Sequence, residues 1–256
     1  MDSTNESGDR APSGPGRKAG GTRGGARAQV AEETRARILD AAFGVFAEQG
    51  FAAPLRAVAD RAGVSAALIV HYFGSHDGLR RACDERFDEL TTELKTDVLD
   101  PVAGPAEARR QSDDIAHYAP MIGYLIRVLR AGDAASIRFV DRMSEAAEQY
   151  LARGVEAGMI RPTGDEPARA RTLVAMSLGA VMLGFPTLDG RIDLETLPER
   201  LDEYRGRSLV PMLEIATYGY LTDSRILDAL THDDTTDHEP TDDDITHHNA
   251  EADGHE

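Results

Sequence analysis

The chain has 256 residues, 41% of them apolar and 29% charged, so it can bury a sizeable core and is not a wholly disordered polymer. Aromatic residues make up only 5% and Trp is absent, a composition that favours helix over sheet. The single cysteine, Cys83, excludes an intramolecular disulfide framework and a multi-cysteine zinc site. No basic-then-apolar segment opens the chain, so we expect no secretory signal and a cytoplasmic location.

The net charge of −17 is distributed unevenly along the chain. Residues 231–256 contain ten acidic residues and no Lys or Arg, whereas residues 1–81 contain eleven basic residues against nine acidic ones. Attraction to a polyanion depends on local surface potential rather than on total charge. The amino-terminal third is therefore the part of the chain that can approach nucleic acid without repulsion.

Both ends of the chain have the composition of disordered segments. Residues 1–30 are rich in Gly, Pro and Ser and also carry basic side chains, so they form either a solvated tail or a basic arm along DNA. Their basic residues are Arg10, Arg17, Lys18, Arg23 and Arg27. Residues 231–256 are acidic and His-rich, and His247–His248 lacks a fold that would define metal geometry. We expect a spacer there, and no metal site or cofactor in the protein.

Apolar spacing predicts a series of short amino-terminal helices. The first covers residues 32–49 and ends at Gly50, and a second begins at Pro54. Gly63 provides a tight turn, after which Ser65 is a good N-cap for a third helix that ends before Gly74. A fourth helix begins near residue 75 and continues to about residue 100.

The remaining segments also predict helices, and none shows the alternation of a strand. We expect helices at 106–115, after 120, at 133–157, 167–185, 198–220 (one kinked helix or two) and 224–230. The uncharged run 172–188 has 17 residues, fewer than the roughly 20 needed to span a bilayer, and predicts a buried helix. The predicted fold class is all-α.

Residues 54–73 have the spacing of a helix–turn–helix motif. A glycine turn sets two short helices at a steep angle, and the second helix presents an exposed face that fits the DNA major groove. This motif is the most informative feature of the sequence.

Four ordered motifs extend this signal over about a fifth of the chain. They are T-R-x-x-I-L-x-A-A from Thr34, F-A-E-Q-G-F at 46–51, A-x-x-A-G-V-S at 59–65 and H-Y-F-G-S at 71–75. This pattern resembles the tetracycline-repressor (TetR) family of transcriptional regulators. The resemblance implies a three-helix DNA-binding domain at 31–91 and a larger helical effector-binding and dimerisation domain at 92–230. It further implies a homodimeric repressor that binds a palindromic operator and is released by a small apolar effector.

The resemblance also suggests which residues contact DNA. Ser65 and Tyr72 match family positions that touch phosphates, and His76 stands where a Lys that reaches the DNA backbone is common. Apolar side chains on the third helix can read thymine methyl groups, which leaves two polar side chains to read base edges. These expected readers are Ala66, Ala67, Val70, His71 and Arg56.

Apolar residues of the later helices are candidates for an effector pocket, although a methionine stripe is also typical of an ordinary core. The candidates are Met121, Tyr124, Leu125, Phe139, Met143 and Met176. The helix from 172 to 185 is apolar on every side, more than one small domain normally buries, and a second copy of the chain would cover the excess.

Two other functional classes remain open at this point. An enzyme or a helical protein-binding adaptor could carry a helix–turn–helix look-alike that does not bind DNA. The folded part has no Ser/His/Asp motif, no phosphate-binding glycine loop and no His pair at metal spacing, so we do not expect an enzyme. Retention on duplex DNA that weakens steeply with salt would separate a DNA-binding protein from both alternatives.

Overall fold

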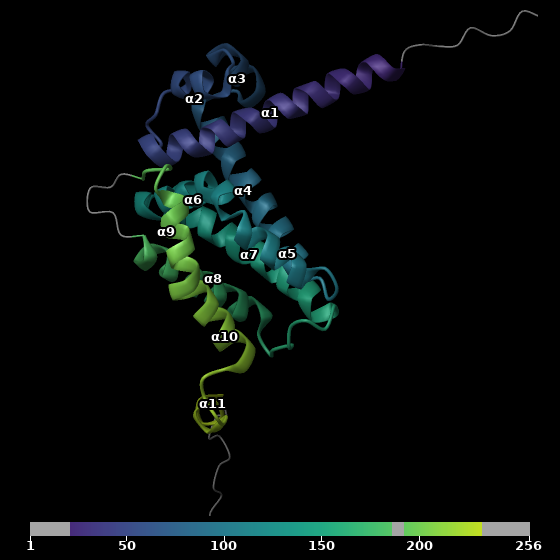
Figure 1. Cartoon of the computed structure of the whole chain (residues 1–256), viewed down its shortest axis with the longest axis vertical. Helices are drawn as coiled ribbons and strands as arrows, with labels where there is room; N and C mark the ends of the chain where they lie inside the picture. The colour runs from purple at the N-terminus through teal and green to yellow at the C-terminus, as the bar shows by residue number, and fades with distance from the viewer. Residues whose placement is uncertain (1–20, 186–191, 232–256) are drawn as a thin grey trace, which may run out of the picture. The chain divides into compact units, whose positions relative to one another are not determined.

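The computed structural model describes residues 21–185 and 192–231, and every regular element in these ranges is a helix (Figure 1). The helices are α1 (Gly21–Gln49), α2 (Leu55–Ala62), α3 (Ala66–Phe73), α4 (His76–Val98), α5 (Gly104–Asp113), α6 (Ala119–Ala131), α7 (Ala134–Glu156), α8 (Glu166–Gly184), α9 (Leu197–Tyr204), α10 (Val210–Tyr218) and α11 (Arg225–Thr231). A 3₁₀ turn (Ile115–Tyr118) precedes α6, and a π-helical turn (Arg205–Leu209) separates α9 from α10. The all-α prediction is confirmed.

Contacts within the chain define two compact units, residues 1–209 and 210–256. The described part of the second unit consists of α10 and α11, and almost all of its residues are exposed. The predicted basic residues 10, 17 and 18 and nearly all of the predicted acidic tail, with His247 and His248, lie outside the described residues.

Helix α1 begins eleven residues earlier than the sequence predicts, at Gly21 instead of Glu32. Residues 25–30 are exposed, so no core contact accounts for this additional length. A helix nucleated by packing propagates cooperatively, and the Ala, Arg and Gln residues of 26–31 are good helix formers. The predicted boundary was wrong because the amphipathic pattern marks only the packed part of the helix.

The later helices begin within two residues of the positions that the sequence predicts. Asp133 caps α7 by accepting a hydrogen bond from the Ser136 backbone N–H at 2.8 Å, and Asp165 caps α8 through the Ala168 N–H, also at 2.8 Å. The segment after residue 197 forms two helices, because the π-helical turn interrupts it.

One hydrophobic core runs from the amino-terminal helices into the later ones. It joins residues of α1, α4, α6, α7 and α8, including Ile38, Phe87, Leu125, Phe139 and Leu178. The predicted division at residue 91 therefore does not separate two cores. The long helix α4 contacts α1 and α3 as well as α5 and α7, so it belongs to both halves of the unit.

An aromatic cluster at the centre of this core joins α6 to α1. The Tyr124 ring centroid lies 5.1 Å from that of Phe43 and 6.3 Å from that of Phe46. Phe51, in the link between α1 and α2, lies 5.5 Å from the same ring. Arg127 of α6 also donates to the Ala47 carbonyl at the end of α1, at 2.7 Å. A displacement of α6 would therefore act directly on α1 and on the link to α2.

A buried polar group connects α4 with α6 and α7. The Tyr124 hydroxyl donates to Asp84 Oδ1 at 2.5 Å, and Arg142 Nε donates to Asp88 Oδ2 at 2.9 Å. Arg142 Nη2 also lies 3.6 Å from Asp84 Oδ2. Burial raises the pKa of both carboxyl groups above the ordinary value, and the nearby Arg142 guanidinium offsets only part of this increase. We call Asp84, Asp88, Tyr124 and Arg142 the interhelical cluster.

Helix α8 is only partly buried by its own protomer, in keeping with the expectation that one domain does not bury an apolar helix on every side. Only Ala170, Val174 and Leu178 are buried along it, whereas Met176 is 49% exposed and Leu183 is 84% exposed. The protomer therefore leaves one apolar face of α8 uncovered.

Among the helices of the described ranges, none has the length and apolar content needed to cross a membrane.

Candidate nucleic-acid interface

The turn between α2 and α3 has the backbone geometry that its sequence predicts. Gly63 adopts the left-handed conformation (φ 66°, ψ 38°), and its N–H bonds to carbonyls at the end of α2. Ser65 then caps α3, because its hydroxyl oxygen accepts a hydrogen bond from the Leu68 N–H at 3.1 Å. Two helices of eight residues are thus joined by three residues, as in a helix–turn–helix motif.

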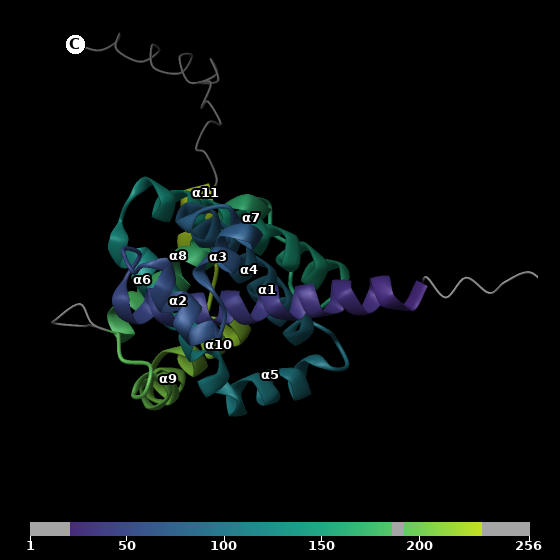
Figure 2. The same cartoon turned by 90° about the horizontal axis from the view of Figure 1, so that it is seen from above.

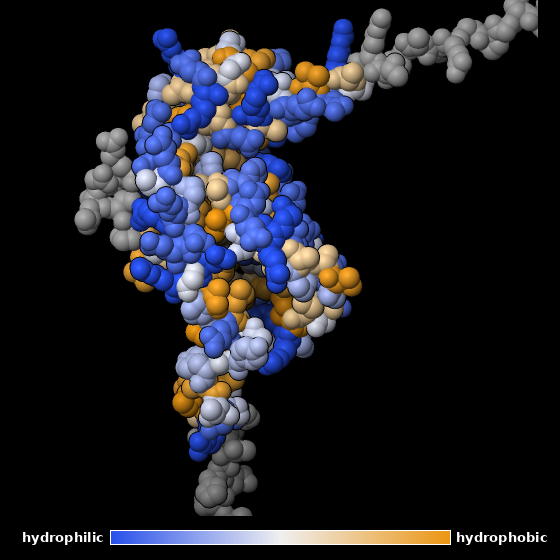
Figure 3. Space-filling model, viewed as in Figure 1, coloured by the Kyte–Doolittle hydropathy of each residue, from blue (hydrophilic) through white to orange (hydrophobic). Residues whose placement is uncertain are grey.

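Helix α3 presents one exposed face. Ile69 is fully buried, whereas Ala67, Val70 and His71 are exposed. These three positions are spaced by three and four residues and therefore share one face of the helix. Figure 1 shows that α2 and α3 form one end of the first unit, and Figure 3 shows that hydrophilic and apolar residues are mixed on this end.

The remaining α3 candidates lie at the margin of this face. Ala66 and Tyr72 are half-buried and pack against the core, so only part of each is available to a partner. The Tyr72 ring is perpendicular to that of His71, with centroids 5.7 Å apart. The Ser65 oxygen is used by the cap, but its O–H hydrogen is still available to donate to a phosphate.

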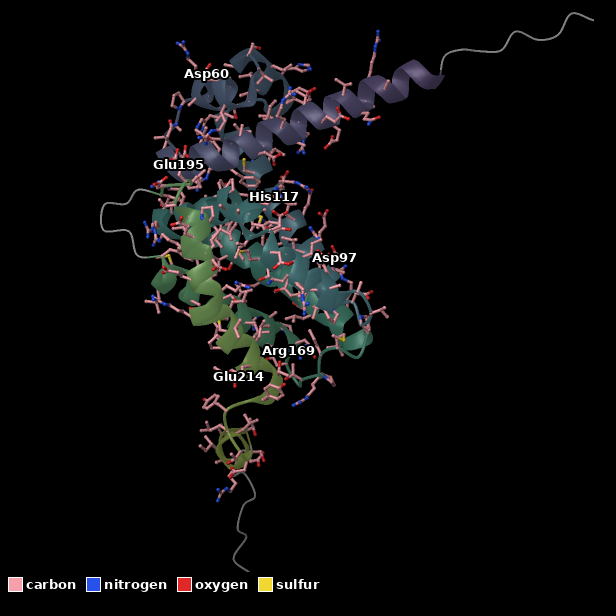
Figure 4. The ribbon with its side chains drawn as sticks, in the orientation of Figure 1. Asp60, Asp97, His117, Arg169, Glu195 and Glu214 are labelled. Atoms are coloured by element: carbon pink, nitrogen blue, oxygen red, sulfur yellow. The ribbon has the colours of Figure 1, made fainter. Side chains whose placement is uncertain are left out.

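Arg56 projects from the first turn of α2, with 87% of its side chain exposed. Its Nε lies 3.9 Å from the carboxylate of Asp60, one helical turn later, so the guanidinium is already beside an acid. Figure 4 shows Asp60 at the same end of the unit as α3. Since the pair is exposed, its energy is small, and Arg56 can exchange Asp60 for a phosphate or a base at little cost.

His76 is turned into the protein, unlike the DNA-facing position that the sequence predicts. Its Nε2 lies 2.9 Å from the Ala53 carbonyl oxygen and must donate there, because a carbonyl oxygen only accepts. The imidazole also packs edge-on against Phe46, with ring centroids 5.5 Å apart. His76 therefore ties the start of α4 to the link before α2, and this nitrogen is not free for the DNA backbone.

Two residues that position α3 were not among the predicted site residues. Gly78, in the first turn of α4, has no room for a side chain, because a Cβ there would lie 1.8 Å from the Phe73 carbonyl oxygen. Arg35 of α1 lies over the Phe73 ring, with its guanidinium carbon 5.7 Å from the centroid. Glycine is unfavourable in a helix, so its presence at position 78 could have indicated a close approach of another segment. Nothing in the sequence indicated the contact of Arg35 with Phe73.

The Ser65 cap gives a first testable prediction. Ser65→Ala removes the acceptor for the Leu68 N–H, which should cost about 1 kcal/mol of stability and lower the melting temperature by about 2–4 °C. Ser65→Thr keeps a hydroxyl acceptor and should retain most of the stability. Thermal unfolding of the three proteins measures both effects, and an unchanged melting temperature in Ser65→Ala would contradict the capping role.

Acidic and imidazole side chains do not gather at one metal site in the part of the chain that is described. Figure 4 shows Asp60, Asp97, His117 and Glu195 on different elements, far from a common point. Within residues 21–185 and 192–231, no group of three or more His, Cys, Asp or Glu side chains could hold a metal ion.

The capped turn and the exposed face of α3 define a helix–turn–helix DNA-binding protein. Residues 38–83 match the family described as "Bacterial regulatory proteins, tetR family", and residues 116–222 match "Tetracyclin repressor-like, C-terminal domain". The HTH-type transcriptional regulatory protein RaaS of Mycobacterium tuberculosis is 38% identical over 197 residues, which cover 76% of this chain and 90% of RaaS.

Two solved structures from other bacteria also match the chain. A TetR-family regulator from Pectobacterium atrosepticum is 22% identical, with 76% of this chain and 97% of that chain covered at a TM-score of 0.46. A Rhodococcus protein described as a putative TetR-family regulator is 16% identical, with 72% of this chain and 98% of that chain covered at a TM-score of 0.48. On the sequence match to RaaS, the chain belongs to the TetR family of DNA-binding transcriptional regulators. The predicted family and the predicted functional class are confirmed, and the chain belongs to a family of regulators rather than enzymes.

Proposed function

We propose that this protein is a cytoplasmic homodimeric repressor that binds a palindromic operator and leaves it when a small apolar effector binds. The observation that supports it most is the exposed face of α3, held at one end of the unit by the capped turn after α2. In the proposed complex this face lies in the major groove of one operator half-site.

The side chains on this face suggest how bases are read. His71 is the one exposed polar side chain of α3. Its ring N–H can donate a hydrogen bond to a purine ring nitrogen or to a carbonyl oxygen of a base. Ala67 and Val70 offer apolar contact to thymine methyl groups. In the proposed complex Arg56 from α2 adds a second polar contact, and the hydroxyl groups of Ser65 and Tyr72 donate to phosphates.

The uncovered face of α8 supports a homodimer. Met176, Met182 and Leu183 are 49%, 39% and 84% exposed, although large apolar side chains are usually buried. A second copy related by a two-fold axis would bury the same face from both protomers. In the second unit, α10 also exposes apolar side chains, and Figure 3 shows apolar surface on this part of the chain. Two recognition helices about 34–36 Å apart would then meet successive major grooves.

The effector candidates form part of the core. Tyr124, Leu125 and Phe139 are buried, and Met121 and Met143 pack partly buried against them. Met176 lies on the exposed face of α8 and does not join them. A hollow of about 660 Å³ lies along α5, between Pro105 and Asp114, and none of the candidates lines it. Because the candidates of α6 and α7 are packed in the core, an effector that contacts them in the proposed mechanism pushes these two helices apart.

Such a displacement has a direct route to the DNA-binding end. Tyr124 touches α1 through Phe43, the α1–α2 link through Phe51 and α4 through Asp84. A movement of α6 would change the position of α4 and α1, and with them the separation of the two α3 helices. Coupling energies of this kind are typically about 1–3 kcal/mol.

Selection of bound sequences from a random duplex library tests the proposal. We expect a palindrome with half-sites one helical turn apart, bound with an affinity that falls steeply between 50 and 200 mM salt. His71→Ala should weaken binding to the selected duplex by roughly 5- to 150-fold, the equivalent of about 1–3 kcal/mol, and relax the sequence preference at one base pair.

Arg138→Ala is the matched control, because Arg138 is exposed on α7, away from the motif. It should bind the selected duplex as the wild type does. A protein that binds no duplex at low salt would refute the proposal, and a His71→Ala protein with unchanged preference would remove His71 from base reading.

A further inference from the structure

The amino-terminal part of α1 extends beyond the helix–turn–helix body. The guanidinium of Arg35 over Phe73 marks the point where α1 passes the end of α3. From there α1 continues for fourteen residues to Gly21, or about 21 Å at 1.5 Å per residue. Figures 1 and 2 show this half of α1 running away from α2 and α3 and leaving the unit at the end that they occupy.

Residues 25–30 of this extension pack against none of the residues outside α1 that the structure describes. Residues 25–30 are all exposed, and no atom of a neighbouring residue lies within 4 Å of the position that a Cβ on Gly25 would take. An exposed helical segment of this length gains little stability by itself. Its residues therefore do not serve the core, which leaves them available to a partner.

Arg27 is the charged side chain of residues 25–31, and it lies more than about 100° around the helix from the acids Glu32 and Glu33. At about 100° per residue, Arg27 and Arg37 fall within an arc of roughly 80° that includes Glu48. Glu48 bonds to Arg61 of α2 at 2.7 Å, so this arc lies on the side of α2. The acids Glu32 and Glu33 fall outside it. Residues 25–31 contain Arg27 and no acid.

We propose that the exposed extension of α1, residues 25–30, is a second DNA-binding element that contacts phosphates flanking the groove occupied by α3. This rests on the proposed function of α3. Arg27 lies eight residues beyond Arg35, or about 12 Å along the helix. The major groove of B-DNA is also about 12 Å wide, so this distance brings Arg27 to the phosphates at the edge of the groove in which α3 lies. Arg27 contacts the backbone and reads no sequence, as is usual for an arginine on phosphate.

The test uses the full chain and two duplexes that carry the selected operator. One is trimmed to the operator, and the other is extended by one helical turn, about 10 base pairs, on each side. The salt dependence is the affinity at 50 mM salt divided by the affinity at 200 mM. On the extended duplex, Arg27→Gln should reduce this ratio by about threefold for each α1 extension of the dimer. On the trimmed duplex, Arg27→Gln and wild type should bind alike, and Arg138→Gln should match the wild type on both.

A second pair of variants tests the helix itself. Val30→Pro interrupts α1 outside the folded body and should reproduce the Arg27→Gln loss on the extended duplex, whereas Val30→Ala should not. Arg27 and Val30 are both exposed, so the melting temperature of each variant should stay at the wild-type value.

The outcomes separate this inference from the proposed function. If the wild type binds neither duplex, the proposed function fails. If the wild type binds both duplexes and Arg27→Gln binds each of them with wild-type affinity and salt dependence, only the second DNA-binding element is overturned. A loss of equal size on the trimmed and the extended duplex would also overturn it, because the contact would then lie within the operator.

Discussion

Gly78→Ala should abolish most of the affinity for operator DNA without touching a residue that contacts it. A methyl group at this position would lie 1.8 Å from the Phe73 carbonyl oxygen, so α3 and α4 must separate. Overpacking of this kind costs about 1–3 kcal/mol of stability. Because α3 is only eight residues long and is held at its end by α4, we expect at least a tenfold loss of affinity for the selected duplex.

The substitution isolates the effect of the added methyl group. The Gly78 N–H donates to the hydroxyl oxygen of Ser75, the N-cap of α4, at 3.0 Å, and alanine keeps that N–H. Gly164→Ala is the matched control, because Gly164 lies in the link before α8 with open space around it. Fluorescence anisotropy gives the affinity and urea unfolding the stability. Wild-type affinity in Gly78→Ala would show that the approach of α3 to α4 does not position the recognition helix.

Arg142→Ala should destabilise the protein strongly and in a pH-dependent way. Arg142 bonds to Asp88 and lies 3.6 Å from Asp84, so its removal leaves two largely buried carboxylates without their cation. Breaking a buried ion pair costs about 3–5 kcal/mol. The Arg142 side chain is 37% exposed, so solvent screening reduces this value, and we expect about 2–3 kcal/mol at pH 7.5.

The pH dependence follows from the direction of the two pKa shifts. Burial raises the pKa of Asp84 and Asp88 in the folded protein above the ordinary value of 3.8, so the folded state binds their protons more tightly than the unfolded state. The stability that this contributes is fully present below the ordinary pKa and is lost as the pH rises through the folded values. Removing Arg142 raises both folded pKa values further.

The destabilisation by Arg142→Ala should therefore be larger at pH 7.5 than at pH 5.0. Urea unfolding of both proteins at the two pH values measures this difference. Arg138→Ala, one turn earlier on the same helix and exposed, should change the stability by less than about 0.5 kcal/mol at either pH. An Arg142→Ala destabilisation of equal size at both pH values would mean that the two carboxylates do not depend on Arg142 for their charge.

The sequence predicted the helix–turn–helix motif almost residue by residue, because local chemistry determines it. Gly63 and Gly74 both have positive φ, a conformation that favours glycine, and Ser65 accepts the hydrogen bond that starts α3. These preferences act within four residues, so they can be seen in the sequence. The spacing of apolar residues likewise predicted the later helices, because a 3.6-residue repeat places them on one face.

The start of α1 and the enclosure of α8 were not predictable in this way. Helix propagation beyond the packed region of α1 leaves no amphipathic pattern, so the sequence placed its start at Glu32 instead of Gly21. An apolar helix such as α8 can be buried by its own protomer or by a partner, and its composition is the same in both cases.

By itself, the sequence determined the all-helical class, the turn geometry and the family, because these depend on short-range preferences and ordered motifs. Only the tertiary structure decided that His76 faces Ala53, that Gly78 must lack a side chain and that Tyr124 pairs with Asp84, forty residues away. Each of these depends on which helices meet and at what distance, and packing between distant segments sets that distance.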